Sequence, residues 1–105
     1  MPNLHKIAKK TKLDQRSKHL REIIIDCLEH EKRGHVGSSL SLVEIIRVLY
    51  DKIIKFNSKR PNDKKRDRFI LSKGHGCLAL YALLYDKKFI TKKQLFSVGQ
   101  FDSIL

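Results

Sequence analysis

The sequence lacks any apolar run long enough to cross a membrane. A spanning helix needs about 18 or more consecutive apolar residues, whereas the longest stretches here, residues 23–25 and 77–85, are short or mixed. Residues 1–12 are rich in lysine and contain no apolar stretch of the kind that a signal peptide needs. We therefore expect a cytoplasmic protein that has no membrane among its partners.

Cysteine is also scarce. Cys27 and Cys77 stand fifty residues apart and belong to no close-spaced ligand pattern. This spacing excludes a disulfide-rich secreted scaffold and a cysteine-based zinc site as the basis of the fold. We expect both thiols to be free and buried.

Acidic residues are few, so the charge balance is strongly basic. Lys and Arg number 23 against 11 Asp and Glu, which gives a net charge of +12. Seven basic residues lie between Lys6 and Arg21 and nine between Lys52 and Lys73, whereas residues 22–50 are slightly acidic. Positive charge that is concentrated in a leader and one polar loop is typical of a solvated surface. The electrostatic field of this charge also attracts phosphate-bearing small molecules.

The length of 105 residues and the apolar content of 41% suit one small globular domain or part of a larger one. The first predicted helix begins at Asp14, as N-cap or first-turn acid, and ends at Lys32 and Arg33 with Gly34 beyond it. Its inward face is predicted by spacings of three and four residues: Leu13, Ser17, Leu20, Ile24, Cys27 and Leu28.

A second helix is predicted after a tight loop. Residues 34–40 are rich in glycine and hydroxyl groups, which disfavour a helix. Ser41 and Glu44 then have the spacing of a capping box, which predicts a helix to about Lys52. Its inward residues are expected to be Leu42, Ile45, Ile46 and Leu49.

The second half predicts a strand followed by a buried helix. Residues 68–72 are mainly apolar, as in a strand of a parallel sheet that is buried on both faces. Residues 77–85 are apolar almost all round and predict a deeply buried helix. Thr91 and Gln94 form another capping box, which starts a last helix to about Val98. A lone strand needs ladder partners, so we expect a mostly helical piece of an α/β domain.

Two loops place a histidine between glycines at a helix start. His35 lies between Gly34 and Gly37, and His75 lies between Gly74 and Gly76. Glycine lets a ligand approach the backbone, and helix starts offer unpaired N–H groups. Histidine donates hydrogen bonds to phosphate or hydroxyl groups and exchanges protons near neutral pH. The alternative is that each histidine merely caps a helix or packs in its loop.

These loops carry a family resemblance. Residues 34–41 resemble the G-H-x-G-x-x-L-S segment of transketolases. Residues 67–76 resemble the family's D-R-F-x-L-S-K-G-H stretch, and residues 79–82 resemble the A-L-Y-A that follows in many members. The resemblance covers about residues 14–105, so we divide the chain into a basic leader, 1–12, and an incomplete N-terminal part of a thiamine-diphosphate-binding domain, 13–105.

The resemblance implies a chemistry that composition does not. Transketolases bind thiamine diphosphate at a dimer interface and move a two-carbon ketol unit from a ketose phosphate to an aldose phosphate. By resemblance, His75 and Gly74 lie near the cofactor's diphosphate. His35 matches the histidine on the substrate side, which is credited with proton transfer to sugar hydroxyls.

The departures from the family pattern limit what this chain does alone. Val36 stands where many members have proline. The G-D-G motif that binds Mg²⁺ and the pyrimidine-binding domain are absent, so we expect the metal ligands to lie outside this chain. We expect an inactive segment that works with the C-terminal portion or a partner subunit of the same enzyme, in a homo- or hetero-oligomer.

Two alternatives come from other functional classes. One is a small basic nucleic-acid-binding module, which the net charge of +12 favours. The sparse aromatic residues in 52–73 and the long glycine-rich turn between the first two helices argue against it. The other is a non-catalytic fragment that docks on a full-length relative through the apolar helix 77–85.

Overall fold

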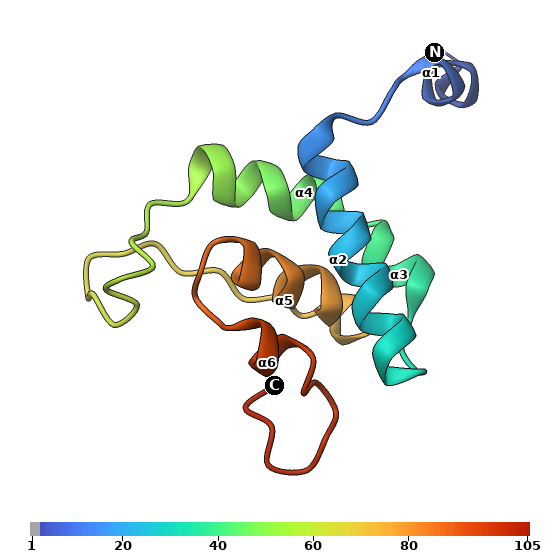
Figure 1. Cartoon of the computed structure of the whole chain (residues 1–105). Helices are drawn as coiled ribbons and strands as arrows, with labels where there is room; N and C mark the ends of the chain where they lie inside the picture. Colours follow the sequence, from blue (N-terminus) through green and yellow to red (C-terminus); the bar gives the residue numbers. More distant parts are fainter. Residues whose placement is uncertain (1–2) are drawn as a thin grey trace.

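The sequence folds into one long helix and several short ones. In a computed structural model, which describes residues 3–105, the elements follow one another as in Figure 1. They are α1 (Leu4–Lys10), α2 (Gln15–Glu31), α3 (Val36–Leu40), α4 (Val43–Val48), the π-helical turn η1 (Leu49–Ile53), the 3₁₀ turn η2 (Gly74–Gly76), α5 (Cys77–Asp86) and α6 (Lys92–Leu95).

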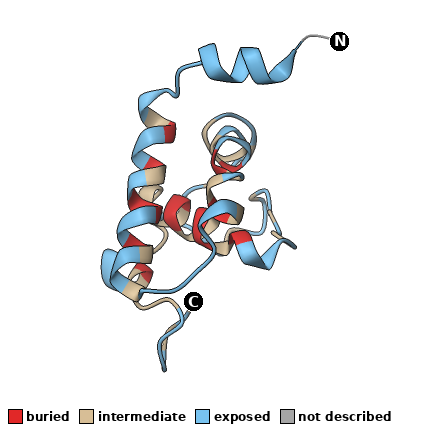
Figure 2. Ribbon diagram, turned by 90° about the vertical axis from the view of Figure 1, so that its right-hand side faces the viewer, coloured by how far each residue is buried: buried red, intermediate tan, exposed pale blue. Residues whose placement is uncertain are grey.

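The core lies where α2, α4 and α5 pack together, with α6 closing one end. Figure 2 shows the buried residues on the faces that these helices turn toward one another, while α1 carries none. The buried apolar side chains are Leu20, Ile23, Ile24, Cys27, Val43, Ile46, Leu78, Ala79, Ala82, Leu83 and Leu95. The prediction that residues 77–85 form a helix is thus confirmed, but its burial is partial, because only Leu78, Ala79, Ala82 and Leu83 are fully buried.

The ends of α2 follow the sequence signals with one difference. Asp14 is the N-cap, and its carboxylate accepts a hydrogen bond from the Ser17 backbone N–H at 2.8 Å. At the other end Lys32, with φ 58°, takes the left-handed conformation. Gly34, with φ 137°, lies two residues further on, where a Cβ would approach Leu28 to 2.4 Å. Glycine is therefore needed at Gly34 for both its backbone angle and its space.

The predicted loop and capping box before α4 are wrong. Residues 36–40 form the short helix α3. The Ser41 hydroxyl donates to the Ser38 carbonyl, and the Glu44 carboxylate pairs with Arg21 of α2 at 2.6 Å. Because a charged partner is available to Glu44, its side chain does not fold back to cap the helix.

The predicted inward faces are right at most of their positions. Leu13 and Ile45 are exposed, at 43% and 59%, while Val43 is buried although the pattern did not select it. The helix end is close to the prediction, since α4 continues through η1 to Ile53. At the last helix, the capping box of Thr91 and Gln94 is confirmed.

The strand predicted at residues 68–72 is not formed. No strand occurs among residues 3–105, and this segment runs as an irregular link into η2. The prediction that it is buried on both faces is also wrong, because Ile70 is 89% exposed. No neighbouring strand lies within the described residues, so the segment has no ladder to join. The described part is therefore helical, and it contains no sheet.

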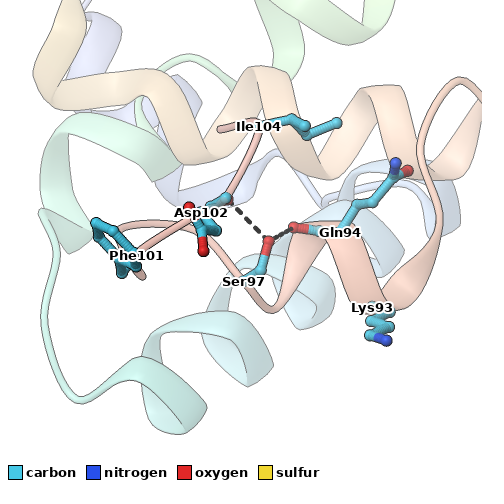
Figure 3. Close-up of a pocket in the computed structure, with 7 residues that line it drawn as sticks. Lys93, Gln94, Ser97, Phe101, Asp102 and Ile104 are labelled. Atoms are coloured by element: carbon cyan, nitrogen blue, oxygen red, sulfur yellow. Dashed lines mark hydrogen bonds between the residues drawn. The ribbon is translucent and has the colours of Figure 1, made fainter.

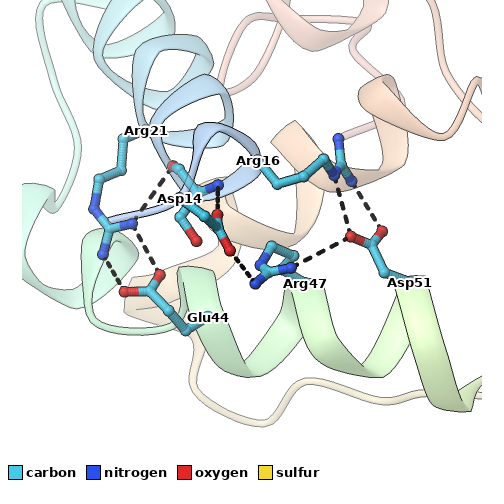
Figure 4. Close-up of polar contacts among 7 residues, drawn as sticks. Asp14, Arg16, Arg21, Glu44, Arg47 and Asp51 are labelled. Atoms are coloured by element: carbon cyan, nitrogen blue, oxygen red, sulfur yellow. Dashed lines mark hydrogen bonds and ion pairs between the residues drawn. The ribbon is translucent and has the colours of Figure 1, made fainter. Parts of the chain in front are cut away.

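A network of ion pairs ties the N-terminal end of α2 to α4 and η1 (Figure 4), and Arg16 also pairs with Asp86 at the end of α5. Asp51 lies at its centre and accepts two hydrogen bonds from Arg16, at 2.9 and 3.1 Å, and contacts Lys87 at 2.6 Å. Arg47 also faces Asp51 and pairs with Asp14. Burial alone would raise the pKa of Asp51, but the hydrogen bonds from Arg16 and Lys87 outweigh it and lower that pKa to about 2.

The molecule exposes more surface than a compact protein of its mass. Its accessible area is 7919 Å², whereas a compact monomer of this size exposes about 6,100 Å². The excess includes apolar side chains: Ile45, Ile53, Ile70, Phe101 and Ile104. Within residues 3–105, no helix combines the length and apolarity needed to span a bilayer.

Candidate functional site

The two predicted histidine loops lie side by side. His35 is the N-cap residue of α3, and His75 is the middle residue of η2. Their ring centroids are 4.5 Å apart, with the planes at 73°, so the rings meet edge to face. Both side chains are exposed, and neither ring makes a hydrogen bond to the described residues. Two imidazoles that are 40 positions apart in the sequence thus lie together, and their nitrogens are available to a ligand.

Gly76 allows this close approach. A Cβ on Gly76 would lie 2.3 Å from a methyl carbon of Leu42 and 3.0 Å from the Ser38 carbonyl oxygen. Only a residue without a side chain fits between η2 and α3 at this point. Gly74 differs, since a Cβ there would meet nothing within 4 Å. The space in front of Gly74 is therefore open to a ligand.

Lys73 links the same two loops. Its ammonium donates to the Ser41 hydroxyl at 3.0 Å and lies 3.4 Å from the Ser38 carbonyl oxygen. It adds positive charge beside His75, and an ammonium has three N–H donors to share. Motif reasoning did not select Lys73 or Gly76 as site residues, although both flank the Gly74–His75 pair in the sequence.

A hollow of about 330 Å³ adjoins the histidine pair. Its lining includes His35 and Cys77 but not His75. On one wall the Arg33 guanidinium donates to the Gly99 carbonyl at 2.8 Å, which brings the turn after α6 against the end of α2. The remaining lining is formed by Glu31, Gly34, Leu78 and Val98.

Cys27 is not placed as a nucleophile. Both cysteines are free; Cys27 is buried and Cys77 is half-buried, so the expected burial is complete only for Cys27. Burial, followed by the charges of Glu31 and Cys77, raises the pKa of Cys27 to about 11. A thiol with such a pKa carries almost no thiolate at neutral pH.

The donor set suits an anion and not a metal ion. Two imidazoles, the Lys73 ammonium and the open space at Gly74 fit phosphate oxygens, which accept hydrogen bonds. In the part of the chain that the structure describes, no three His, Cys, Asp or Glu side chains gather closely enough to hold a metal ion. The residues present therefore suit the oxygens of a phosphate group.

A second hollow lies at the C-terminal turn (Figure 3), and neither His35 nor His75 lines it. Ser97 lies in its wall, donates to the Gln94 carbonyl at 2.6 Å and shares a 2.8 Å hydrogen bond with Ser103. Its other lining residues are Lys93, Phe101, Asp102 and Ile104. These bonds only fold the turn on itself, so the geometry gives this hollow no chemistry.

The chain matches one family across most of its length. The family described as "Transketolase, thiamine diphosphate binding domain" matches residues 13–103. The transketolase of Aquifex aeolicus is 45% identical over 86 residues, which cover 81% of this chain and 12% of that protein. An apulose-4-phosphate transketolase subunit of Phocaeicola vulgatus is 37% identical over 93 residues, 89% of this chain and 33% of its own.

A plant relative, the chloroplastic transketolase-1 of Arabidopsis thaliana, is 41% identical over 73 residues, which cover 70% of this chain and 10% of that protein. The chain thus spans about a third or less of the length of these relatives. No solved structure matches it.

Proposed function

Because this chain belongs to the transketolase family, matching its thiamine diphosphate binding domain over residues 13–103, we propose that it is the N-terminal segment of a transketolase. The observation that carries the proposal is the meeting of His35 and His75, 4.5 Å apart, from the two loops that resemble the family's motifs. The proposed reaction moves a two-carbon ketol unit between sugar phosphates.

In this proposal the two histidines have different roles. His75 donates a hydrogen bond to a diphosphate oxygen, and the open space at Gly74 admits that group. His35 lines the adjoining hollow, where its ring holds or moves a proton at a hydroxyl group of the sugar. Thiamine diphosphate, when bound, supplies the carbanion chemistry of ketol transfer.

Lys73 and Gly76 keep the two imidazoles at one site. The Lys73 ammonium holds the Ser41 hydroxyl, and Gly76 allows contact between η2 and α3. A group that is misplaced by about 1 Å loses roughly a hundredfold in rate, so these contacts matter although they touch no substrate.

The rest of the enzyme would supply what these residues lack. The Mg²⁺ that balances the diphosphate charge would be held by ligands outside this chain. Strands from the rest of the enzyme would pair with residues 68–72, which would then form a strand and complete an α/β domain. The backbone N–H groups of Phe69–Leu71, which have no partner among the described residues, and the excess of exposed surface support this. One relative is named as a transketolase subunit, so the remainder could be a C-terminal portion or a separate polypeptide, in a homo- or hetero-oligomer.

The compartment proposed is the cytoplasm. Two free thiols, Cys27 and Cys77, suit a reducing environment.

A chimera tests the proposal. The matched segment of the Aquifex aeolicus transketolase is replaced by the corresponding residues of this chain, and ketol transfer is measured with thiamine diphosphate and Mg²⁺. We expect a turnover within about tenfold of the parent, which is a change of about 1.4 kcal/mol in the barrier, and none from the 105-residue chain alone. A chimera that folds, by circular dichroism, but binds no thiamine diphosphate would contradict the proposal.

A further inference from the structure

The helix α1 lies outside the family match and is not used by the proposed function. The match begins at residue 13, whereas α1 ends at Lys10. None of its residues is buried, and Figures 1 and 2 show it standing clear of the other helices at the end of a short link. It is nonetheless capped at both ends. The Asn3 side chain accepts from the Lys6 backbone N–H at 3.2 Å, and the Thr11 hydroxyl donates to the Ile7 carbonyl at 2.8 Å.

The side chains of α1 are divided cleanly between two faces. At about 100° per residue, Leu4, Ile7 and Ala8 fall on one side and the basic residues on the other. Leu4 is 67% exposed and Ile7 is 49% exposed, so the apolar face has no partner among the described residues. The basic face consists of His5, Lys6, Lys9 and Lys10.

The charge of this region is of one sign. No acidic residue occurs between Met1 and Leu13, and Lys12 adds to the four basic residues of α1. The whole chain carries +12, which attracts any extended anionic surface. A complementary partner must therefore be anionic and must also offer an apolar layer to Leu4 and Ile7.

We propose that α1 binds to the surface of an anionic lipid bilayer. Headgroups of such a bilayer attract lysines, and the acyl boundary beneath accepts a short apolar face. The flexible stems of lysines let their charges stay in water while the helix lies in the plane. This proposal departs from the expectation of no membrane partner, which was drawn from the lack of a spanning segment; α1 would lie on the surface without spanning.

A protein groove fits α1 less well. Residues that dominate protein interfaces are Trp, Tyr and Arg, while Lys is depleted there; α1 has three lysines and no Trp, Tyr or Arg. A second copy of the chain offers an acidic stripe on the exposed side of α2, formed by Glu22, Asp26 and Glu29. Two molecules of net charge +12 repel each other, however. Nucleic acid lacks the apolar layer that the face of Leu4 and Ile7 requires.

The test is binding of the full chain to vesicles by co-sedimentation. Vesicles of phosphatidylcholine alone are compared with vesicles that also contain phosphatidylserine. We expect binding only to the anionic vesicles, weakening with salt. Ile7→Ala removes apolar area while favouring the helix, and it should lower the partition coefficient roughly five- to tenfold. Ile70→Ala, the matched control in the irregular segment before η2, should leave it unchanged.

A second pair of variants tests the position of the charges. Lys9→Gln with Lys10→Gln should weaken binding roughly 20- to 30-fold, whereas Lys64→Gln with Lys65→Gln, which removes the same charge elsewhere, should weaken it less than about threefold. If the two double-lysine variants weakened binding equally, or if Ile7→Ala and Ile70→Ala had equal effects, net charge alone would hold the chain on the vesicle. Either result would overturn the proposal. It would also be overturned by no binding, or by a self-association in ultracentrifugation that Ile7→Ala abolishes.

Discussion

At the scale of single residues, the site depends on where side chains are absent as much as on where they are present. Gly76 lies against Leu42 and the Ser38 carbonyl, while Gly74 faces open space. The same motif therefore contains one glycine that packing requires and one that leaves room for a ligand. These two roles can be separated by experiment.

Gly76→Ala should destabilise the chain and Gly74→Ala should not. The added methyl group at Gly76 would overlap Leu42 and press on the Ser38 carbonyl, which should cost about 1–3 kcal/mol of unfolding free energy. At Gly74 the change should stay within about 0.5 kcal/mol. Urea unfolding of both variants measures the difference, and equal stabilities would contradict the contact between η2 and α3.

The histidine variants should separate binding from turnover in the chimera. Loss of one hydrogen bond to a charged oxygen in His75→Ala should weaken thiamine diphosphate binding about 10- to 100-fold. His35→Ala should leave that affinity near normal and lower turnover about 10²- to 10⁴-fold. His19→Ala, an exposed control, should change neither quantity. If both variants kept normal affinity and rate, the assigned roles would be discarded.

At the scale of helices, the sequence predicted what depends on local signals and missed what depends on neighbours. The N-cap at Asp14 and the capping box of Thr91 and Gln94 are local, and both are present. The box at Ser41 and Glu44 failed because Arg21, 23 residues away, takes the carboxylate. The strand at 68–72 failed because a ladder needs a second strand, which no local pattern supplies.

The candidate site follows the same division. The glycine-histidine pattern selected His35 and His75, and the structure brings the two rings together. Lys73 was missed because its partners, Ser38 and Ser41, are more than 30 residues away in the sequence. Such a link can be recognised only once α3 has been placed against η2.

The ion pairs around Asp51 predict acid sensitivity. Its pKa is lowered from 3.8 to about 2 in the folded chain, so its contribution to stability is present above about pH 4 and is lost as the pH falls toward 2. Asp51→Asn should lower the unfolding free energy by about 2 kcal/mol at neutral pH and flatten the stability profile between pH 4 and 2. Thermal melts against pH check this. Asp102→Asn, the same charge change at an exposed residue, is the control, and equal profiles would contradict the network.

At the scale of the whole molecule, the chain is more open than its length requires. The radius of gyration is 14.9 Å, whereas a compact domain of this length has about 13 Å. The helix α1, the irregular residues 54–73 and the C-terminal turn account for the extension in Figure 1. Surface of this kind is available for contacts that the described residues do not make.

Hydrogen exchange should locate that surface. The backbone N–H groups of Phe69, Ile70 and Leu71 have no partner among the described residues, so they should exchange near the rate of an unfolded chain. Those of Ala82 and Leu83, in buried α5, should be protected in the same sample. In a longer protein that supplies neighbouring strands, protection should extend to Phe69–Leu71. Slow exchange there in the 105-residue chain would contradict the structure.

The contact between α3 and η2 should survive a break in the chain between the two histidine loops. The two histidine loops are held together by packing and by Lys73. The irregular residues 57–66, which lie between the loops in the sequence, do not hold them together. A tryptic nick at Lys59 or Lys64 should therefore leave two peptides that co-elute as one particle. The histidine pair could then be reconstituted from two separately synthesised pieces.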